Sequence, residues 1–271
     1  MLLPGEEPLD PEQPSCATSA PVNGSHDALL SPSIQRSVGE KMAAFEVKFL
    51  IHDTIAKQVE EWAATLMDRD AFASAKNNWS YQTTTLYLDT PSRDVFHRSE
   101  GHRKRKFRLR RYGSEARIYL ERKTRQGDRV AKRRCDVPMS DLGALTNGSA
   151  PEGWPGLWFR ERVVATPLQP TCLLTYDRTA FVKLTADGPL RLTLDRRIRG
   201  VGASDWDLTP LDAGHSILPE HVICEFKFRG AMPNLYKDVI HALQLEAGSV
   251  SKYRRMMLAT GVMPDEGTGH A

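Results

Sequence analysis

The basic residues of this chain gather in one segment. Between His102 and Arg134 there are fifteen Lys and Arg residues and three Asp and Glu residues, whereas the whole chain of 271 residues has a formal net charge of only +3. Arginine side chains bind phosphate oxygens through paired hydrogen bonds, and lysines act as point charges. The segment therefore indicates a site for an anion that carries several negative charges.

The alternation of side chains along predicted strands places many of these charges on one face. Successive side chains of a strand point to opposite faces. Arg108 and Arg110 thus share one face, and Phe107 and Leu109 share the other. The same spacing relates further charged residues: Glu121 and Lys123, Glu46 and Lys48, Arg191 and Asp195 through Thr193, and Glu225 and Lys227. Each of these predicted strands has one charged face.

Two arrangements explain such strands. An antiparallel sheet can turn its charged face to water. Alternatively, helices cover the apolar faces, and the charged faces line the interior of a cupped or closed sheet. Like charges two residues apart, as in Arg108 and Arg110, repel each other unless an anion or a carboxylate lies among them. Because unpaired buried charges are costly, the second arrangement predicts an interior filled by water or by a highly charged anion.

The residue types favour a nucleoside triphosphate or a linear polyphosphate over a nucleic acid. Base-stacking aromatic residues are sparse in the basic segment, which has only Phe107, Tyr112 and Tyr119. No G-x-x-x-x-G-K-[ST] phosphate loop occurs, which argues against a P-loop enzyme. The carboxylate of Glu225 could bind Mg²⁺ or Mn²⁺ between phosphates, or it could form an ion pair with a lysine.

Helices and strands that would position these residues can be recognised from hydrophobic spacing. Apolar residues recur at helical spacing from Thr54 to Met67, with Asp53 or Thr54 as the N-cap, and a second helix is expected from Leu235 to Leu245, ended by Gly248. A helical insertion is expected within 140–170. Strands are predicted at 45–49, 83–88, 106–111, 117–123, 129–137, 173–182, 190–195 and 222–228. The predicted fold class is α+β with a mostly antiparallel sheet.

The two ends of the chain differ in composition from the middle. Residues 1–41 are rich in Pro, Ser, Gly and acidic residues, which predicts a disordered leader before one folded domain at 42–261 and a disordered tail at 262–271. The longest apolar runs are far shorter than the roughly 20 residues that span a bilayer. We expect a cytoplasmic protein that could join a membrane only through a partner.

Eight short motifs follow one another along the chain. They are 45–49 (FEVKF), 86–90 (LYLDT), 106–112 (KFRLRRY), 120–124 (LERKT), 176–181 (YDRTAF), 191–195 (RLTLD), 225–227 (EFK) and 251–253 (SKY). In this order they resemble the VTC domain, the polyphosphate polymerase module of the vacuolar transporter chaperone complex. That domain belongs to the triphosphate tunnel metalloenzyme, or CYTH-like, superfamily. The resemblance covers about residues 43–260.

The resemblance implies a fold, an activity and a set of site residues. The implied fold is an antiparallel eight-stranded β-barrel tunnel flanked by helices, in which the γ-phosphoryl group of ATP is transferred to a growing inorganic polyphosphate chain with the help of Mn²⁺ or Mg²⁺. The residues implied to bind phosphates are Lys48, Arg108, Arg110, Lys123, Lys132, Arg178, Arg191 and Lys227. Lys252 would bind phosphate and guard the tunnel, and Glu225 would bind the metal. The residues implied to take part in catalysis are Lys48, Arg108, Arg110, Lys123, Arg178, Arg191 and Lys252.

Two positions bear on the choice between transfer and hydrolysis. Hydrolytic members of the superfamily resemble one another in an opening E-x-E-x-K motif, but Ala44 stands here at the first glutamate position, and Glu225 is followed two residues later by Lys227. Fewer carboxylates give weaker support for a second metal and for activation of water. Transfer to phosphate is therefore favoured. The alternatives are a nucleoside triphosphatase or tripolyphosphatase of the same fold, and a non-catalytic polyphosphate-binding module.

Overall fold

The computed structural model describes residues 44–102, 104–126, 129–146 and 149–261; the predicted leader (1–41) and tail (262–271) lie outside them. The helices are α1 (Asp53–Leu66), α2 (Asp94–His97), α3 (Leu157–Ala165), α4 (Asn234–Ala242) and α5 (Lys252–Ala259), with 3₁₀ segments η2 (Ala75–Asn77) and η3 (Met139–Leu145). The strands are β1 (Ala44–His52), β2 (Asp68–Arg69), β3 (Ser80–Asp89), β4 (Arg105–Tyr112), β5 (Arg117–Gln126), β6 (Arg129–Pro138), β7 (Gln169–Lys183), β8 (Leu190–Gly202), β9 (His215–Ser216) and β10 (His221–Arg229).

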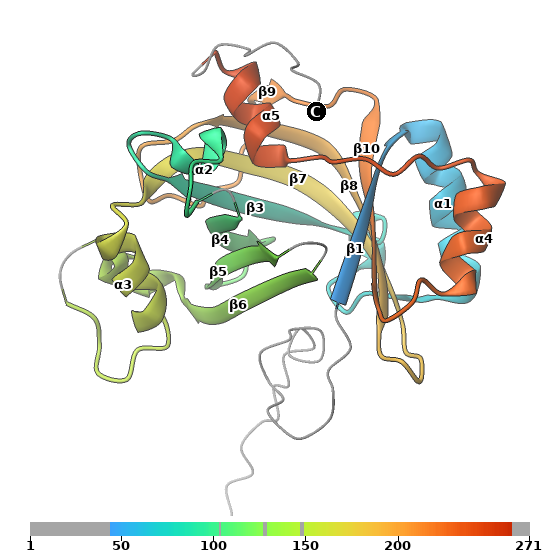
Figure 1. Ribbon diagram of the computed structural model, residues 1–271, viewed down its shortest axis with the longest axis horizontal. Helices are drawn as coiled ribbons and strands as arrows, with labels where there is room; N and C mark the ends of the chain where they lie inside the picture. The colour runs from blue at the N-terminus through green and yellow to red at the C-terminus, as the bar shows by residue number, and fades with distance from the viewer. Residues whose placement is uncertain (1–43, 103, 127–128, 147–148, 262–271) are drawn as a thin grey trace, which may run out of the picture.

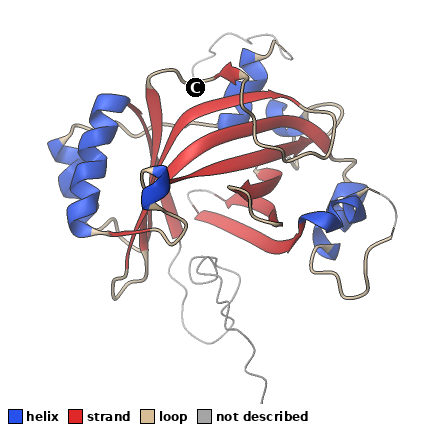
Figure 2. Ribbon diagram, turned by 180° about the vertical axis from the view of Figure 1, so that it is seen from behind, coloured by secondary structure: helices blue, strands red, loops and turns tan. Residues whose placement is uncertain are grey.

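The strands form one curled antiparallel sheet (Figures 1 and 2). The eight long strands follow the order β1-β10-β8-β7-β3-β4-β5-β6, and the two-residue strands β2 and β9 pair with β7 and β8. Within the described residues β1 and β6 approach each other but do not pair, so the sheet is not closed by hydrogen bonds. The predicted α+β fold and all predicted strands are confirmed, and β2 and β9 are additional.

Helices cover the outer face of the sheet, as the alternation of side chains predicted. α1 and α4 lie side by side against β1, β8 and β10 (Figure 1), where Phe49 and Phe226 pack in one core with Val59 and Tyr236. α3 and η3 cover β3, β4 and β5, where Phe107 and Leu109 are buried beside Phe159. The charged residues between these apolar positions therefore point to the inside of the curl.

A third core holds α5 against one end of the curled sheet. Met256 and Met257 of α5 pack against Tyr87, Leu174 and other side chains of β3, β7 and β8. The Tyr253 hydroxyl donates a hydrogen bond to the buried Asp89. These contacts fix the start of α5, which carries Lys252.

Some predicted helix boundaries were wrong. The N-cap of α1 is His52, whose ring nitrogen accepts from the Thr54 amide, and not Asp53 or Thr54. α4 ends at Ala242, before the predicted stop at Gly248. The amide of Gly248 instead donates to the Lys48 carbonyl, 2.8 Å away, so Gly248 lies along the edge of β1. No helix in the described part of the chain combines the length and hydrophobicity needed to cross a membrane.

Gly200 allows α5 to lie close to β8. A Cβ atom there would lie 2.6 Å from Met256 Sδ and 2.8 Å from the Leu173 carbonyl oxygen, which are distances too short for contact. We expect Gly200→Ala to lower the free energy of unfolding by about 1–3 kcal/mol, measured by urea denaturation. Gly202→Ala is the matched control, because a Cβ atom there meets nothing within 4 Å. Equal stability of the two variants would contradict this packing.

Candidate functional site

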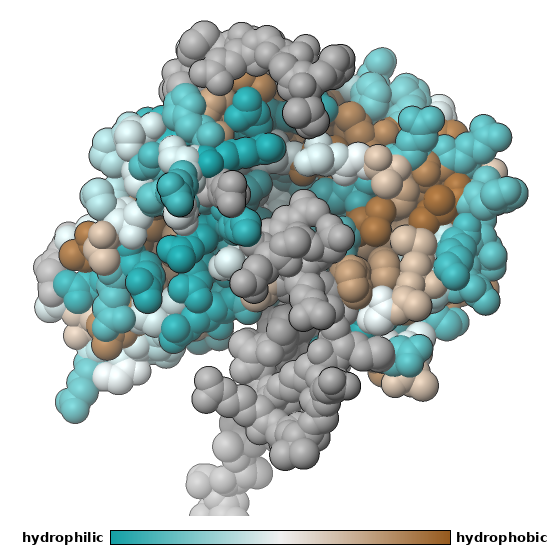
Figure 3. Space-filling view, in the orientation of Figure 1, coloured by the Kyte–Doolittle hydropathy of each residue, from teal (hydrophilic) through white to brown (hydrophobic). Residues whose placement is uncertain are grey.

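A cavity of about 1130 Å³ lies inside the curled sheet. Cations from several strands line it: Lys48 of β1, Lys106, Arg108 and Arg110 of β4, Lys123 of β5, Arg178 of β7 and Lys227 of β10, joined by Arg98, Lys104 and Lys252. Two carboxylates, Glu46 and Glu225, also line it. Figure 3 shows hydrophilic residues gathered in the region where Figure 1, in the same orientation, draws the strands β4–β6. The cavity brings together most of the predicted site residues.

Acidic and basic side chains alternate where β1 pairs with β10. The register places Glu46 opposite Lys227 and Lys48 opposite Glu225. Lys48 forms an ion pair with Glu46 and another, at 3.2 Å, with Glu225. Lys227 lies 2.6 Å from Glu225. Lys123 of β5 reaches Glu46 of β1 at 2.7 Å, although these two strands are not neighbours in the sheet.

These ion pairs set the charge of both carboxylates. Burial alone would raise the pKa of Glu225, but Lys227, Lys48 and Lys123 hold it well below its usual range. Burial and the nearby Glu225 would likewise raise the pKa of Glu46, yet the same lysines lower it. Both groups are therefore ionised at neutral pH, and both already accept hydrogen bonds from lysine ammonium groups.

Glu121 is the acidic centre of the arginine cluster. Its side chain has no exposed surface, and its Oε2 atom lies 2.7 Å from Arg108 Nε and 3.9 Å from Arg110 Nη1. Its Oε1 atom lies 2.8 Å from Lys132 Nζ. Burial would raise the pKa of Glu121, but Lys132, Arg108 and Arg110 hold it far below its usual range. The Oε1 atom also lies 3.6 Å from Arg134 Nε, so one buried negative charge supports four cations.

A second carboxylate orients the cations on β7 and α5. Asp195 of β8 accepts two hydrogen bonds from Arg178, at 2.7 and 2.8 Å, and a third from Lys252 at 2.5 Å. Burial opposes the charge on Asp195, but the pKa of this carboxyl is lowered by Arg178 and Lys252. Since Ser251 is the N-cap of α5, the first residue of that helix is held at the cavity wall.

Lys106 lies in the cavity although the motif comparison did not select it as a site residue. Its Nζ atom donates to Ser251 Oγ at 2.9 Å, and no carboxylate of the described residues pairs with it. Burial and the neighbouring Lys123, Lys48 and Arg108 lower the pKa of Lys106 to about 7. Its spacing of two residues from Arg108 is the signal in the sequence that places it on the same face.

Two residues that were predicted to bind phosphate, Lys132 and Arg191, do not line the cavity. Lys132 of β6 pairs with Glu121 behind the arginines. Arg191 of β8 lies 2.9 Å from Asp70 and 3.3 Å from the Tyr81 hydroxyl. Both project from the inner face of the sheet, but their ion pairs hold them beyond the cations of the cavity.

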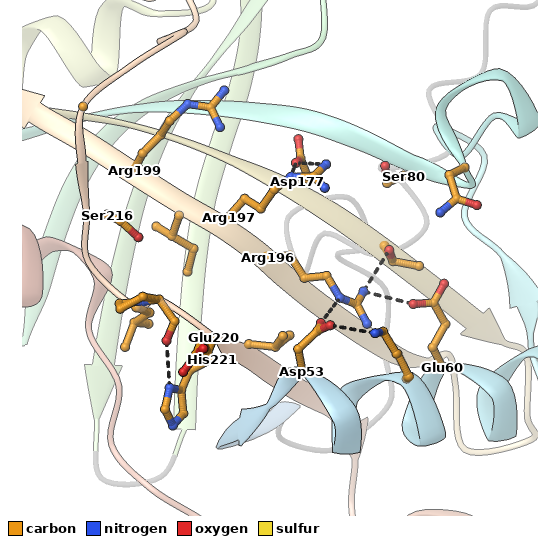
Figure 4. Close-up of a pocket in the computed structure, with 18 of the residues that line it drawn as sticks. Asp53, Glu60, Ser80, Asp177, Arg196, Arg197, Arg199, Ser216, Glu220 and His221 are labelled. Carbon is orange, nitrogen blue, oxygen red and sulfur yellow. Dashed lines mark hydrogen bonds and ion pairs between the residues drawn. The ribbon is translucent and has the colours of Figure 1, made fainter.

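A further cavity, of about 1000 Å³, lies outside the curl beside α1, β7 and β8 (Figure 4). Its arginines are engaged with neighbouring oxygen atoms. Arg196 lies 3.1 Å from Asp53 and 3.0 Å from Glu60, and Arg197 donates to Asp177 at 2.6 Å. Acidic and basic residues are mixed around this cavity, whereas cations predominate inside the curl. The inner cavity is therefore the better candidate for a phosphate site.

Comparison with known protein families identifies the family of this chain. The model of the VTC domain matches residues 43–260. The chain belongs to the VTC domain family. A search of curated proteins found no match. Membership of the VTC family supports a role in handling triphosphates or polyphosphate, in agreement with the cations inside the sheet.

Solved structures with a similar arrangement share little sequence with this VTC domain. The PH1819 protein of Pyrococcus horikoshii OT3 has 13% identity and a TM-score of 0.44, over 79% of this chain and 98% of its own. The HpAC1 protein of Hippeastrum, described as having a dominant triphosphatase activity, has 12% identity and a TM-score of 0.49, over 81% of this chain and 96% of its own.

Glu121 should be essential for stability in the absence of ligand. We expect Glu121→Gln to lower the free energy of unfolding by about 3–5 kcal/mol, because it leaves buried cations without their counter-charge. Tripolyphosphate should stabilise this variant more than the wild type, since the anion supplies the missing charge. Urea denaturation with and without tripolyphosphate measures both effects. The exposed Glu61→Gln on α1 is the control, and equal ligand stabilisation of all three proteins would contradict the role of Glu121.

Lys106 should make anion binding depend on pH. A bound phosphate favours the protonated amine and so raises the pKa of Lys106 from about 7. Affinity for tripolyphosphate should therefore be highest below pH 7 and should fall as the pH rises above it, by at most about tenfold per pH unit. Isothermal titration at pH 6 to 9 in buffers of different ionisation enthalpy should detect proton uptake on binding. Lys106→Gln should abolish the part of this uptake that is centred near pH 7; unchanged uptake would show that another group titrates.

Proposed function

We propose that this VTC domain is a polyphosphate polymerase that transfers the γ-phosphoryl group of ATP to the end of a growing inorganic polyphosphate chain. The observation that carries the proposal is the cavity inside the sheet, in which cations from five strands face one another. Guanidinium and ammonium groups on facing strands suit a flexible chain of phosphates, because each phosphate can meet cations on more than one side.

The cations differ in burial along the cavity. The Lys227 side chain is 41% exposed, whereas that of Arg110 is only 6% exposed. In this proposal, the exposed lysines attract the anion, and the buried Arg108, Arg110 and Arg178 hold the phosphates that react. Fixed donors in a site that excludes water stabilise the charge that develops on the transferring oxygens, and positioning makes the reaction effectively intramolecular.

Transfer to phosphate requires little help from a base. The attacking oxygen of orthophosphate or of the chain end is already anionic, unlike water, which must lose a proton. The carboxylates that line the cavity are Glu46 and Glu225, and both accept hydrogen bonds from lysines. Their pKa values are lowered, which makes them weak bases. This supports transfer over hydrolysis.

The donor set fits Mn²⁺ or Mg²⁺ held jointly by protein and substrate. Within the described residues there is no group of three or more His, Cys, Asp or Glu side chains that could hold a metal. Mg²⁺ is often bound through one or two carboxylates together with substrate phosphates. Glu225, with Glu46 beside it, would supply those carboxylates. When bound, the ion would neutralise charge on the leaving phosphates.

The remaining predicted residues have supporting roles in this proposal. Lys48, Lys123 and Lys227 neutralise the two glutamates and remain within reach of phosphates in the cavity. Lys252 guards the wall near α5, while Lys132 and Arg191 act behind the cations of the cavity. In this proposal the substrate is ATP, and the expected compartment is the cytoplasm.

The direct test is to incubate the purified protein with ATP and Mn²⁺ and to resolve the products on a gel. We expect long-chain polyphosphate together with ADP. Arg108→Ala should lower kcat/KM by about 10²–10³-fold, because it removes a preorganised donor. Glu225→Gln should abolish the stimulation of activity by Mn²⁺, because it removes a carboxylate that would bind the metal.

Arg197→Ala is the matched control, because Arg197 lies in the outer cavity and its side chain is 74% exposed. This variant should keep wild-type activity. Orthophosphate as the only product would replace the proposal by a nucleoside triphosphatase or tripolyphosphatase. Tight polyphosphate binding without nucleotide consumption, unchanged in Glu225→Gln, would indicate a non-catalytic binding module.

A further inference from the structure

A group of arginines lies on the outer face of the sheet, on the opposite side of β4–β6 from the cavity. Phe107 of β4 is buried in the core beneath α3, and alternation places Arg105 on the same outer face. The register extends this face across the next two strands, because Arg122 is opposite Phe107 and Arg133 is opposite Arg122. Together with Arg162 of α3, these residues form what we call the outer arginine patch: Arg105, Arg122, Arg133 and Arg162.

Trp158 of α3 holds two arginines of the patch in place. The guanidinium carbon of Arg133 lies 4.3 Å from the centre of the Trp158 ring, and that of Arg122 lies 6.0 Å from it. These are distances at which a cation is attracted to an aromatic face. The Trp158 Nε1 atom donates to Cys135 Sγ of β6 at 3.2 Å, which fixes the ring against the sheet. The two guanidinium groups therefore have defined positions on the surface.

The charges of the outer arginine patch are not neutralised within the described part of the chain. No carboxylate there forms an ion pair with any of the four arginines. Burial and the other three arginines lower the pKa of Arg122, so the four charges lie close enough to repel one another. By contrast, the exposed Arg117 and Arg197 each pair with an aspartate. Like charges that face each other on neighbouring strands are destabilising, so an anion bound here would relieve repulsion.

The patch is continuous with the lining of the inner cavity. Lys104 lines the cavity, and the next residue, Arg105, belongs to the patch; both are exposed. Arg98 also lines the cavity, is exposed, and lies close enough to Lys106 to contribute to its lowered pKa. Cations therefore extend from the inner face, over the start of β4, to the outer face of the same strands.

We propose that the outer arginine patch is a second polyphosphate-binding site, which holds the part of a chain that extends out of the cavity over the start of β4. A chain that lengthens in a cavity of fixed volume must continue outside it. Two linked contacts on one chain give a higher affinity than either contact alone. This inference rests on the proposed function, because it takes polyphosphate as the anion in the cavity.

The residue types of the patch favour polyphosphate over other anionic partners. All four cations are guanidinium groups, which match phosphate oxygens through paired hydrogen bonds. A single-stranded nucleic acid would need an aromatic face on which a base can stack, but Arg133 already lies over the Trp158 ring. Continuity with the cavity favours an anion that the cavity also binds, in preference to a lipid surface.

Chain length separates the two sites experimentally. Tripolyphosphate can occupy the cavity alone, whereas a long linear polyphosphate of defined length can reach the patch as well. We expect the double variant Arg105→Gln and Arg133→Gln to lower the affinity for the long chain by about tenfold. Its affinity for tripolyphosphate should equal that of the wild type. Isothermal titration calorimetry at one fixed salt concentration measures both affinities.

The double variant Arg117→Gln and Arg197→Gln is the matched control. It removes the same number of positive charges, and both side chains are more than half exposed. This control should bind both anions as the wild type does. Arg162→Gln changes the patch from α3 without altering the sheet, and it should also weaken binding of the long chain alone. Thermal unfolding checks that each variant folds, and Arg162→Gln decides the inference if the first double variant does not.

Several results would overturn the second site while leaving the proposed function intact. One is wild-type affinity for the long chain in the patch variants. Another is an equal loss of affinity for tripolyphosphate, because the patch would then act on the cavity. Anionic lipid vesicles or single-stranded DNA that bind the wild type but not the patch variants, while the long chain binds all of them equally, would assign the patch to that partner instead. Failure of the wild type to bind either polyphosphate would overturn the proposed function, and this inference with it.

Discussion

The structure depends on the neutralisation of cations that are packed on the inner face of a sheet. Arg108 and Arg110 lie two residues apart on one strand and would repel each other without a counter-charge. Glu121 supplies that charge from the neighbouring strand, fully buried. Asp195 does the same for Arg178 and Lys252. Each buried carboxylate is shared by more than one cation, so the domain can fold without a ligand and still retain positive charge for one.

The sharing of carboxylates also explains why the net charge of the chain is a poor guide to whether it has an anion site. Outside the curl, Arg196 and Arg197 are paired with nearby carboxylates, and the outer cavity has mixed charge. Inside, Lys106 has only a hydroxyl as its hydrogen-bond partner among the described residues. Burial depresses the pKa of Lys106, and neighbouring cations that outnumber their local carboxylates lower it further. An anion that enters the cavity relieves repulsion that the fold itself maintains.

The sequence was sufficient for features that depend on alternation and insufficient for those that depend on distant contacts. Phe107 and Leu109 are buried while Arg108 and Arg110 face the cavity, because a regular strand preserves alternation. The same rule identifies Lys106 in hindsight. By contrast, the pairing of Arg191 with Asp70 joins β8 to a loop far away in the chain, and no spacing reports it. The packing of Phe72 on Tyr112 was hidden for the same reason.

The carboxylates that hold the cations also limit the chemistry of the site. A hydrolase must generate a nucleophile from water, which requires a base or a metal-bound hydroxide. Glu46 and Glu225 are committed to Lys48, Lys123 and Lys227, and their lowered pKa values make proton abstraction unfavourable. In the proposed function a phosphate chain end arrives already ionised, and the cations that would disable a base are the ones that would position it. The interactions that allow this sheet to enclose positive charge thus favour an anionic nucleophile over water.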